Sequence, residues 1–255
     1  MSNSKVEWFK GDLPTELFKE AENLLYLVGK SNRCNHILSF LTGAPSDFNN
    51  FGVGISHIVL KFEHWSRKWE YPWIIVNGGF EPGQHVMDAG GAGSILGYRL
   101  SELGCKVIIL DKDPERLVEL DTYSHLNNNI KVKVGDIHDI PYPDDTFDRV
   151  ICCSVLEHCE GPVDISKELW RVVRPGGKLI ITMDVTESNY LDGANCVNDK
   201  ISQEILDRFG LKLPDSKDAV KNTFSDGKTF ATLRVLGFCC EKNLCRGLVS
   251  VAEKK

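Results

Sequence analysis

This sequence of 255 residues lacks three features, and each absence excludes a class of location or partner. No apolar run approaches the ~20 residues that a membrane-spanning helix needs. The first residues, MSNSKVEWFKGDLP, have neither a basic start nor an apolar centre, so we expect no signal peptide. Basic residues are not in excess, because 30 Lys and Arg face 36 Asp and Glu for a formal charge of -6. We therefore expect no membrane partner and no nucleic-acid partner.

Paired cysteines are also missing. The chain has nine cysteines, yet none of them forms a CxxC pair, and several fall in apolar runs that predict buried strands. Clustered cysteines are the usual sign of a disulfide framework or a zinc site. We therefore expect reduced core thiols in a cytoplasmic protein and no metal site. Hydrophobic content of 42% and charged content of 26% are ordinary for a soluble globular chain.

What the chain does contain is most informative between residues 85 and 113. His85–Ala89 is a short apolar run entered through Pro and Gly, which favours a buried parallel strand. Gly90, Gly91 and Gly93 follow, and glycines allow a tight turn and a close approach of the backbone to a ligand.

A helix and a second strand complete this unit. Ile95–Leu103 places three leucines on one helical face and ends at a glycine, and Lys106–Leu110 is again apolar. Asp111 closes the second strand, about twenty residues past the turn, where an acid holds the hydroxyls of a nucleotide ribose. A solvated strand-end acid is the alternative. The pattern predicts a nucleoside-containing cofactor.

The charge at the turn indicates which cofactor. A dinucleotide would bring a pyrophosphate to the helix N-terminus, where Asp88 would repel it. An ammonium and a sulfonium suit this acid better. The stretch VMDAGGAGS resembles motif I of the class I S-adenosylmethionine-dependent methyltransferases. That motif has an acid and then three glycines at alternate positions, which in this chain are Gly90, Ala92 and Ser94, so two of the three are replaced.

Two later blocks strengthen the resemblance, which covers roughly residues 81–184 and points to the type 11 methyltransferase-domain group. They are VGDIHDIPYPDDTFDRVICCSVLEHCEGP and RVVRPGGKLIIT. The resemblance implies that Asp136 holds the adenine amino group and that the backbone amide of Ile137 meets the ring. It also implies that cofactor and acceptor meet at the loop from Ser154 to His158.

The expected fold is α/β, with a Rossmann-like, doubly wound and mainly parallel seven-stranded sheet. An N-terminal helical cap and an insertion after the fifth strand complete it. We expect the cap at 1–80 (helices near 14–29, 36–41 and 55–69), the cofactor-binding core at 81–184, and an insertion or lid at 185–225 with a helix at 201–209. A final helix at 229–236 and a strand pair at 238–243 and 247–252 fill 226–255.

Three further residues have two interpretations each. Lys112 either contacts the cofactor through its backbone or stem, or is solvent-exposed. Arg67 lies in the aromatic cluster HWSRKWEYPW, which either packs a helix on the sheet or closes over the cofactor. In the second case its guanidinium reaches the methionine carboxylate. His158 either acts as a general base or orients its loop.

The sequence thus predicts transfer of a methyl group from S-adenosylmethionine to an O, N or C nucleophile of a small molecule, by in-line displacement, with S-adenosylhomocysteine as product. One alternative is an NAD(P)-dependent oxidoreductase, since Gly91 to Gly97 fits a GxGxxxG loop. Against it, the only Tyr-x-x-x-Lys, Tyr26 to Lys30, precedes the first strand. Another is a non-catalytic protein that binds S-adenosylmethionine, which the replaced glycines leave open.

Overall fold

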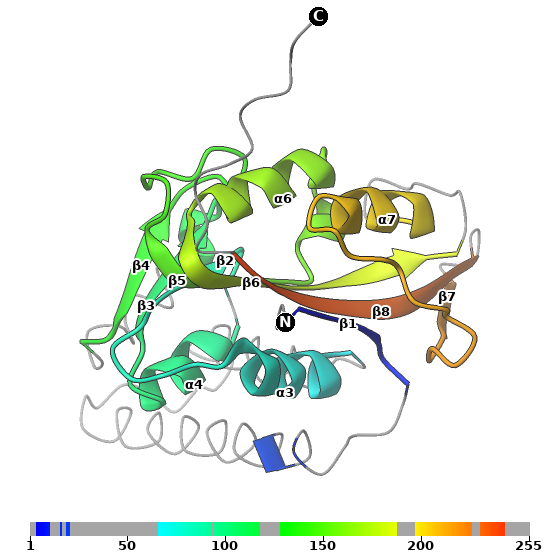
Figure 1. The fold of residues 1–255 in the computed structure, drawn as a ribbon, viewed down its shortest axis with the longest axis horizontal. Coiled ribbons are helices and arrows are strands. Elements are labelled where there is room, and N and C mark those ends of the chain that lie inside the picture. The colour runs from blue at the N-terminus through cyan, green and yellow to red at the C-terminus, as the bar shows by residue number, and fades with distance from the viewer. Residues whose placement is uncertain are drawn as a thin grey trace, which may run out of the picture.

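The computed structural model describes residues 4–10, 16, 19–20, 66–92, 94–117, 128–187, 197–225 and 230–242. One sheet lies between two layers of helices (Figure 1). Its strands are β1 (Lys5–Trp8), β2 (His85–Ala89), β3 (Lys106–Asp111), β4 (Ile130–Val134), β5 (Phe147–Cys153), β6 (Val173–Thr186), β7 (Asn222–Ser225) and β8 (Phe230–Glu241). The helices are α3 (Arg67–Gly78), α4 (Leu96–Glu102), α6 (Pro162–Arg171) and α7 (Asp199–Asp207), with a 3-10 turn η1 (Leu156–His158).

The sheet is doubly wound. Its strands follow the order β1-β8-β6-β5-β2-β3-β4, and β7 pairs with β8. The pairs among β2, β3, β4, β5 and β6 are parallel, whereas β8 is antiparallel to β6. The expected Rossmann-like, mainly parallel sheet is therefore confirmed. The chain order reverses direction between β2 and β5, and ligands of such sheets bind where the strand order reverses.

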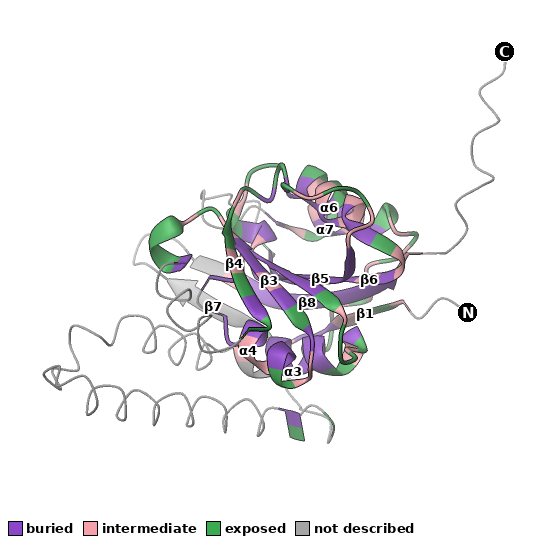
Figure 2. Cartoon of the chain, turned by 90° about the vertical axis from the view of Figure 1, so that its left-hand side faces the viewer, coloured by how far each residue is buried: buried purple, intermediate pink, exposed green. Residues whose placement is uncertain are grey.

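Both faces of the sheet are buried, which explains why its strands read as continuous apolar runs (Figure 2). Successive residues face opposite layers. Val86 packs into the core beneath α3 and α4, and Met87 into the core beneath α6 and α7. In the same way, Ile151 packs into the core beneath α3 and α4, and Cys152 into the core beneath α6 and α7. The two helical layers thus hold the central strands rigid from both sides. No helix among the described residues is long and apolar enough to cross a membrane.

The helix expected at 229–236 is wrong, because Phe230–Glu241 forms the long strand β8. Leu233, Arg234, Val235 and Leu236 are all at most 5% exposed. Such a run is compatible with a helix or with a strand covered on both faces, and the length of the run does not separate the two. Gly237, which suggested a helix end, instead lies in the strand and faces the indoles of α3. The strand pair expected near 247–252 lies outside the described residues.

Residues 1–80 are not purely helical either. Lys5–Trp8 forms β1, which pairs antiparallel with the part of β8 from Leu236 to Cys239. The other edge of the same residues pairs with β6, so β1 covers what would be an exposed edge. Trp8 anchors it by donating its indole N–H to the carbonyl of Pro214 over 2.8 Å. The helices expected near 14–29 and 36–41 lie almost wholly outside the described residues.

The expected insertion contains a core helix. The helix predicted at 201–209 is confirmed as α7, and Asn198 caps it by accepting a hydrogen bond from the amide of Ile201 over 3.0 Å. Ile205 and Leu206 are fully buried beside β8. Phe209 packs its ring 5.6 Å from that of Phe238. This part of 185–225 therefore completes the layer of α6, whereas residues 188–196 lie outside the described residues.

The aromatic cluster packs a helix on the sheet. Trp69, Tyr71 and Trp73 of α3 are at most 3% exposed, and the rings of Trp69 and Trp73 lie 5.5 Å apart. The predicted helix at 55–69 is seen only from Arg67 onward, and it continues through Pro72 to Gly78. Burial of the surrounding aromatics offsets the loss of one helical hydrogen bond.

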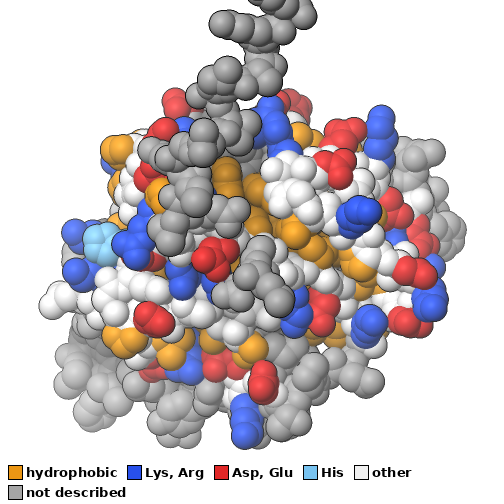
Figure 3. Space-filling model, in the orientation of Figure 1, with side chains coloured by type: hydrophobic (Ala, Val, Ile, Leu, Met, Phe, Trp, Pro, Cys, Tyr) orange, Lys and Arg blue, Asp and Glu red, His pale blue; other side chains and the backbone are white. Residues whose placement is uncertain are grey.

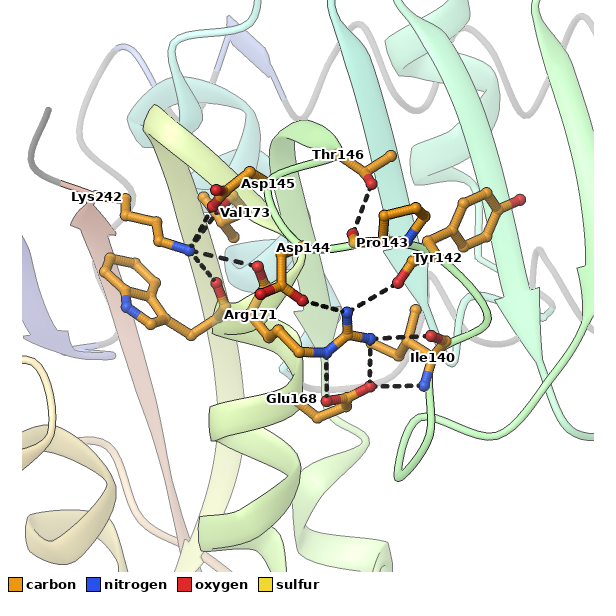
Figure 4. Close-up of polar contacts among 11 residues, drawn as sticks. Ile140, Tyr142, Pro143, Asp144, Asp145, Thr146, Glu168, Arg171, Val173 and Lys242 are labelled. Carbon is orange, nitrogen blue, oxygen red and sulfur yellow. Dashed lines mark hydrogen bonds and ion pairs between the residues drawn. The ribbon is translucent and has the colours of Figure 1, made fainter. Parts of the chain in front are cut away.

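A polar network closes the opposite, amino-terminal ends of β5 and β6 (Figure 4). Lys242 donates to Asp145 Oδ1 over 3.0 Å and to the carbonyl of Val173 over 2.7 Å. Arg171, at the end of α6, binds both carboxylate oxygens of Glu168 over 2.8 and 2.7 Å. These contacts tie α6, β6 and the residue after β8 together and leave the carboxyl ends of the strands open to other roles.

Candidate functional site

The residues that the sequence singles out gather at the carboxyl ends of the parallel strands. Asp88 is on β2 opposite Ile151 of β5, Asp111 ends β3, and Ser154 follows β5 directly. Asp184 lies near the end of β6. These positions flank the point at which the strand order reverses, which is where doubly wound sheets bind nucleotides.

The glycine turn after β2 is built by close approach. Gly90 has a φ of 74°, and its amide donates to the carbonyl of Leu110 over 2.7 Å. A Cβ on Gly90 would lie 2.6 Å from Val155, and one on Gly91 would lie 2.6 Å from a carboxylate oxygen of Asp88. Both positions therefore exclude side chains, and the Asp88 carboxylate, 1% exposed, lies beneath the turn. Gly93 lies outside the described residues.

The two residues that replace the motif's glycines each have a local role. The amide of Ala92 donates to Asp111 Oδ2 over 3.1 Å. The hydroxyl of Ser94 accepts a hydrogen bond from the amide of Leu96 over 3.1 Å, at the start of α4. The replacements thus fit the turn: the amide of Ala92 ties it to β3, and the hydroxyl of Ser94 binds the first amide of α4.

Asp111 sits between the turn and the next loop. Its other oxygen, Oδ1, accepts a hydrogen bond from the amide of Asp113 over 3.0 Å. A carboxylate has about four lone-pair sites, so two amide donors leave capacity for hydroxyl groups. Lys112 is exposed. The turn therefore meets Asp88 and Asp111, two carboxylates that suit hydroxyl and ammonium groups better than a phosphate.

The loop after β4 carries a second acidic contact. Asp136 is exposed and accepts hydrogen bonds from the backbone amide of His138 over 2.9 Å and from its ring Nδ1 over 2.7 Å. The other ring nitrogen lies 2.9 Å from the carbonyl of Glu160. Hydrogen bonds from the His138 amide and ring lower the pKa of Asp136. The contact with the Glu160 carbonyl, and then that with Asp136, raise the pKa of His138. Ile137 between them is buried.

Arg67 belongs to a buried network on α3. Its Nη1 donates to a carboxylate oxygen of Glu70 and to the Ser154 hydroxyl. That hydroxyl donates to the other Glu70 oxygen over 2.6 Å. Burial is the largest single influence and lowers the pKa of Arg67, but Glu70 together with Cys153, Tyr71 and Glu157 outweighs burial and raises this pKa. Burial would raise the pKa of Glu70, and Arg67 with Ser154 hold it below its usual range. Ser154 itself has a φ of 48°, an uncommon conformation for a residue with a side chain.

Two buried acids near this network were not assigned a role from the sequence. Glu157 is 0% exposed and Asp184 is 8% exposed. The amide of Asp184 donates to Glu157 Oε1 over 3.1 Å, and the Glu157 charge helps to raise the pKa of the Asp184 carboxyl, so the two carboxyl groups are neighbours. His158, the candidate base, is exposed. The position of Glu157 could have identified it as a site residue. An acid one turn past a buried parallel strand lies at the carboxyl end of the sheet, where ligands bind.

Together these residues form an acidic site. Among the described residues, no group of three or more His, Cys, Asp or Glu side chains has the arrangement needed to hold a metal ion. The glycine turn forms the cradle of this site, and at Gly90 and Gly91 it packs so closely on Val155 and Asp88 that a Cβ would not fit. Acceptors for ribose hydroxyls and for an ammonium group line that cradle, so the residues present fit a cationic nucleoside cofactor.

Comparison with known proteins agrees with this geometry. The family model described as "Methyltransferase domain" matches residues 87–181. Ubiquinone biosynthesis O-methyltransferases of Xanthomonas are similar to part of the chain. The protein from Xanthomonas oryzae pv. oryzae is 32% identical over 103 residues, which are 39% of this chain and 43% of that protein. The match thus spans less than half the length of this relative.

Solved structures share the fold at low sequence identity. The YcgJ protein of Bacillus subtilis covers 68% of this chain with a TM-score of 0.55 and 14% identity, over 98% of its own length. A phosphoethanolamine N-methyltransferase of Haemonchus contortus, solved with S-adenosylhomocysteine, covers 70% with a TM-score of 0.52 and 16% identity, over 53% of its length. The [4+2]-cyclase SpnF covers 69% with a TM-score of 0.53 and 12% identity, over 80% of its length. Since one fold carries different activities here, the likeness establishes the fold alone.

Proposed function

We propose that this chain, in which residues 87–181 form a methyltransferase domain of the class I S-adenosylmethionine-dependent type, methylates a small-molecule hydroxyl group. The observation that carries the proposal is the meeting of Asp88, Asp111 and the glycine turn at the point where the strand order reverses. Carboxylates there favour a cofactor with hydroxyl and cationic groups over one with a pyrophosphate.

Each part of the cofactor has a proposed partner. Asp111 would hold the ribose hydroxyls, while Asp136 and the amide of Ile137 would contact the adenine. Asp88 and the turn would hold the amino-acid part. Arg67 would reach the carboxylate of that part through nitrogens other than Nη1, which supplies all of its described hydrogen bonds. A guanidinium has five N–H donors, so these roles are compatible.

Catalysis of this reaction depends mainly on alignment of the acceptor with the methyl group. S-adenosylmethionine supplies a methyl group that the positive charge on sulfur has already activated. The task of the chain is to hold the acceptor on the axis of the bond that breaks and to exclude water. Alignment of this kind contributes up to roughly 7–11 kcal/mol. Ser154, η1 and the carboxyl end of β6 are the described elements nearest to where an acceptor would lie.

A small-molecule acceptor is favoured by two observations. The relatives found by sequence are named O-methyltransferases of ubiquinone biosynthesis. On the face shown in Figure 3, Lys and Arg side chains alternate with Asp and Glu, so the described residues there form no basic stripe for a nucleic acid. The described cysteines are free thiols, which suits the proposed cytoplasmic setting.

The proposal is tested by calorimetry with S-adenosylmethionine, S-adenosylhomocysteine and NADPH as ligands. We expect the first two to bind and NADPH not to bind. Binding of NADPH alone would replace the proposal with a nicotinamide-dependent reductase. A screen of small hydroxyl compounds with methyl-labelled S-adenosylmethionine then tests turnover. Binding with no labelled product from any compound would instead favour a non-catalytic binding protein.

A further inference from the structure

Glu157 and Asp184 form a pair of buried carboxyl groups whose hydrogen bonding is incomplete. Apart from the bond between the Asp184 amide and Glu157 Oε1, two of their oxygens are unsatisfied. Glu157 Oε2 and Asp184 Oδ1 have no hydrogen-bond partner within the described part of the chain. An unpaired charge is costly in such a place, so a buried carboxyl of this kind retains a proton or takes a ligand.

Among the described residues, the surroundings of the pair supply no cation besides Arg67. On α3, Arg67 is already matched by Glu70, and the Tyr71 hydroxyl is beside that ion pair. From β5, the thiol of Cys152 lies near Glu157, and that of Cys153 lies on the other face of the strand, near Glu70. Burial, and then the charge of Glu70, raise the pKa of Glu157 to about 7. Burial, and then Glu157 and Glu70, hold the pKa of Asp184 well above its usual range.

The pair also lies next to the cofactor cradle. Gly90 of the turn packs against Val155, two residues before Glu157. The charges of Asp88 and Glu157 both raise the pKa of the Cys152 thiol, so Asp88 and the Glu157–Asp184 pair lie in one buried neighbourhood. A charge placed in the cradle is therefore felt by the pair through a region with little water to screen it.

We propose that the Glu157–Asp184 pair holds a proton in the resting protein and releases it when a sulfonium binds at the glycine turn. The proposal rests on the proposed function, because it takes the cation to be that of S-adenosylmethionine. The positive charge stabilises the ionised pair, and Glu157 becomes a carboxylate beside the acceptor region. S-adenosylhomocysteine has a neutral sulfur and leaves the pair protonated.

The same ionisation allows Glu157 to accept a proton while S-adenosylmethionine is bound. As the oxygen of a hydroxyl acceptor bonds to the methyl carbon, the carbon–sulfur bond breaks and its electron pair stays on sulfur. The proton of the acceptor passes to Glu157. The positive charge on sulfur and the negative charge on the carboxylate disappear together, which restores the resting pair. Glu157, and not the exposed His158, is then the catalytic base.

The test measures protons released on binding. Titrations of the whole chain at pH 6.5 in buffers of different ionisation enthalpy give the proton count for S-adenosylmethionine and for S-adenosylhomocysteine. With the Glu157 pKa near 7, we expect release of between about half and one proton for the first ligand and about none for the second. Release should fade above pH 8, where Glu157 is already ionised without a ligand. Glu157→Gln should abolish the difference, and the exposed control Glu204→Gln should preserve it.

Equal proton counts for the two ligands, or an unchanged difference in Glu157→Gln, would overturn the proposal while leaving the methyltransferase assignment intact. Failure of both ligands to bind would contradict the proposed function instead. Circular dichroism checks that Glu157→Gln is folded. Asp184→Asn supplies a second variant, for which we expect the released proton to fall by at least twofold.

Discussion

The amide of Ala92 donates a hydrogen bond to Asp111 Oδ2 across 3.1 Å, so the glycine turn after β2 is tied to the end of β3 before any ligand arrives. The same carboxylate receives the amide of Asp113. A residue expected to hold a ribose therefore also shapes the pocket in which the ribose would lie. Preorganisation of this kind lowers the entropy lost on binding.

Asp111→Ala should weaken binding of S-adenosylhomocysteine by roughly 1.5–3 kcal/mol, the worth of hydrogen bonds to a charged group. Asp111→Asn should cost less, because the amide keeps one acceptor oxygen. Calorimetry measures both, with the exposed Asp218→Ala as control. An unchanged dissociation constant for Asp111→Ala would remove the residue from the ribose site. Thermal unfolding separates loss of ligand contacts from loss of the turn.

Gly91→Ala tests the close approach of the turn to Asp88. The added methyl would lie 2.6 Å from a carboxylate oxygen, and overpacking of this kind costs about 1–3 kcal/mol of stability. Differential scanning calorimetry should show a lower Tm. The double variant with Asp88→Ala should recover most of the Tm but not the affinity for S-adenosylhomocysteine. If the double variant remains as unstable as the single one, the turn and Asp88 are not in contact.

The sequence predicted the cofactor half of the fold because local rules decide it. Apolar strands, a glycine turn and acids at strand ends follow from short-range patterns, and β2, α4 and β3 appear within one residue of expectation. The Arg67–Glu70–Ser154 network and the Glu157–Asp184 pair were not predicted, since their members come from different elements and meet only once the sheet has formed. The prediction of a helix at 229–236 in place of β8 failed for a related reason, because burial on both faces removes the alternation of apolar and polar residues that marks a strand.

Stability should depend on pH through Glu157. Its folded pKa is about 7, above the ordinary value of 4.5, so its contribution is fully present below pH 4.5 and is lost as pH rises through 7. Glu157→Gln removes this loss, which is on the order of 3 kcal/mol if the whole shift is expressed. The Tm of the variant should exceed that of the parent more at pH 8 than at pH 5. Parallel curves at every pH would assign Glu157 an ordinary pKa.

Lys242→Met tests whether the network at the amino ends of β5 and β6 is structural only. The change leaves Asp145 and the carbonyl of Val173 without their ammonium partner. Loss of one partner from a partly buried hydrogen-bonded pair costs about 1–3 kcal/mol. Urea denaturation should register this cost, while the exposed control Lys200→Met changes stability by less than about 0.5 kcal/mol. Affinity for S-adenosylhomocysteine should stay within about threefold, or ~0.65 kcal/mol, because the network is at the other end of the strands. A larger loss would mean that the two ends are coupled.

Gly237→Ala distinguishes the strand from the helix that the sequence suggested. In the interior of a helix, replacing Gly by Ala stabilises by about 1 kcal/mol. In β8 the added methyl would lie 2.9 Å from the Trp69 ring and 3.2 Å from the Trp73 ring, both on α3. These rings are buried and fixed by their neighbours, so we expect a loss of about 1–3 kcal/mol in urea denaturation. Trp69→Phe in the same background removes the part of the indole that the methyl meets and should restore some of that loss. A more stable Gly237→Ala variant would contradict the packing of α3 on β8, and with it the placement of Arg67 and Glu70 beside Ser154.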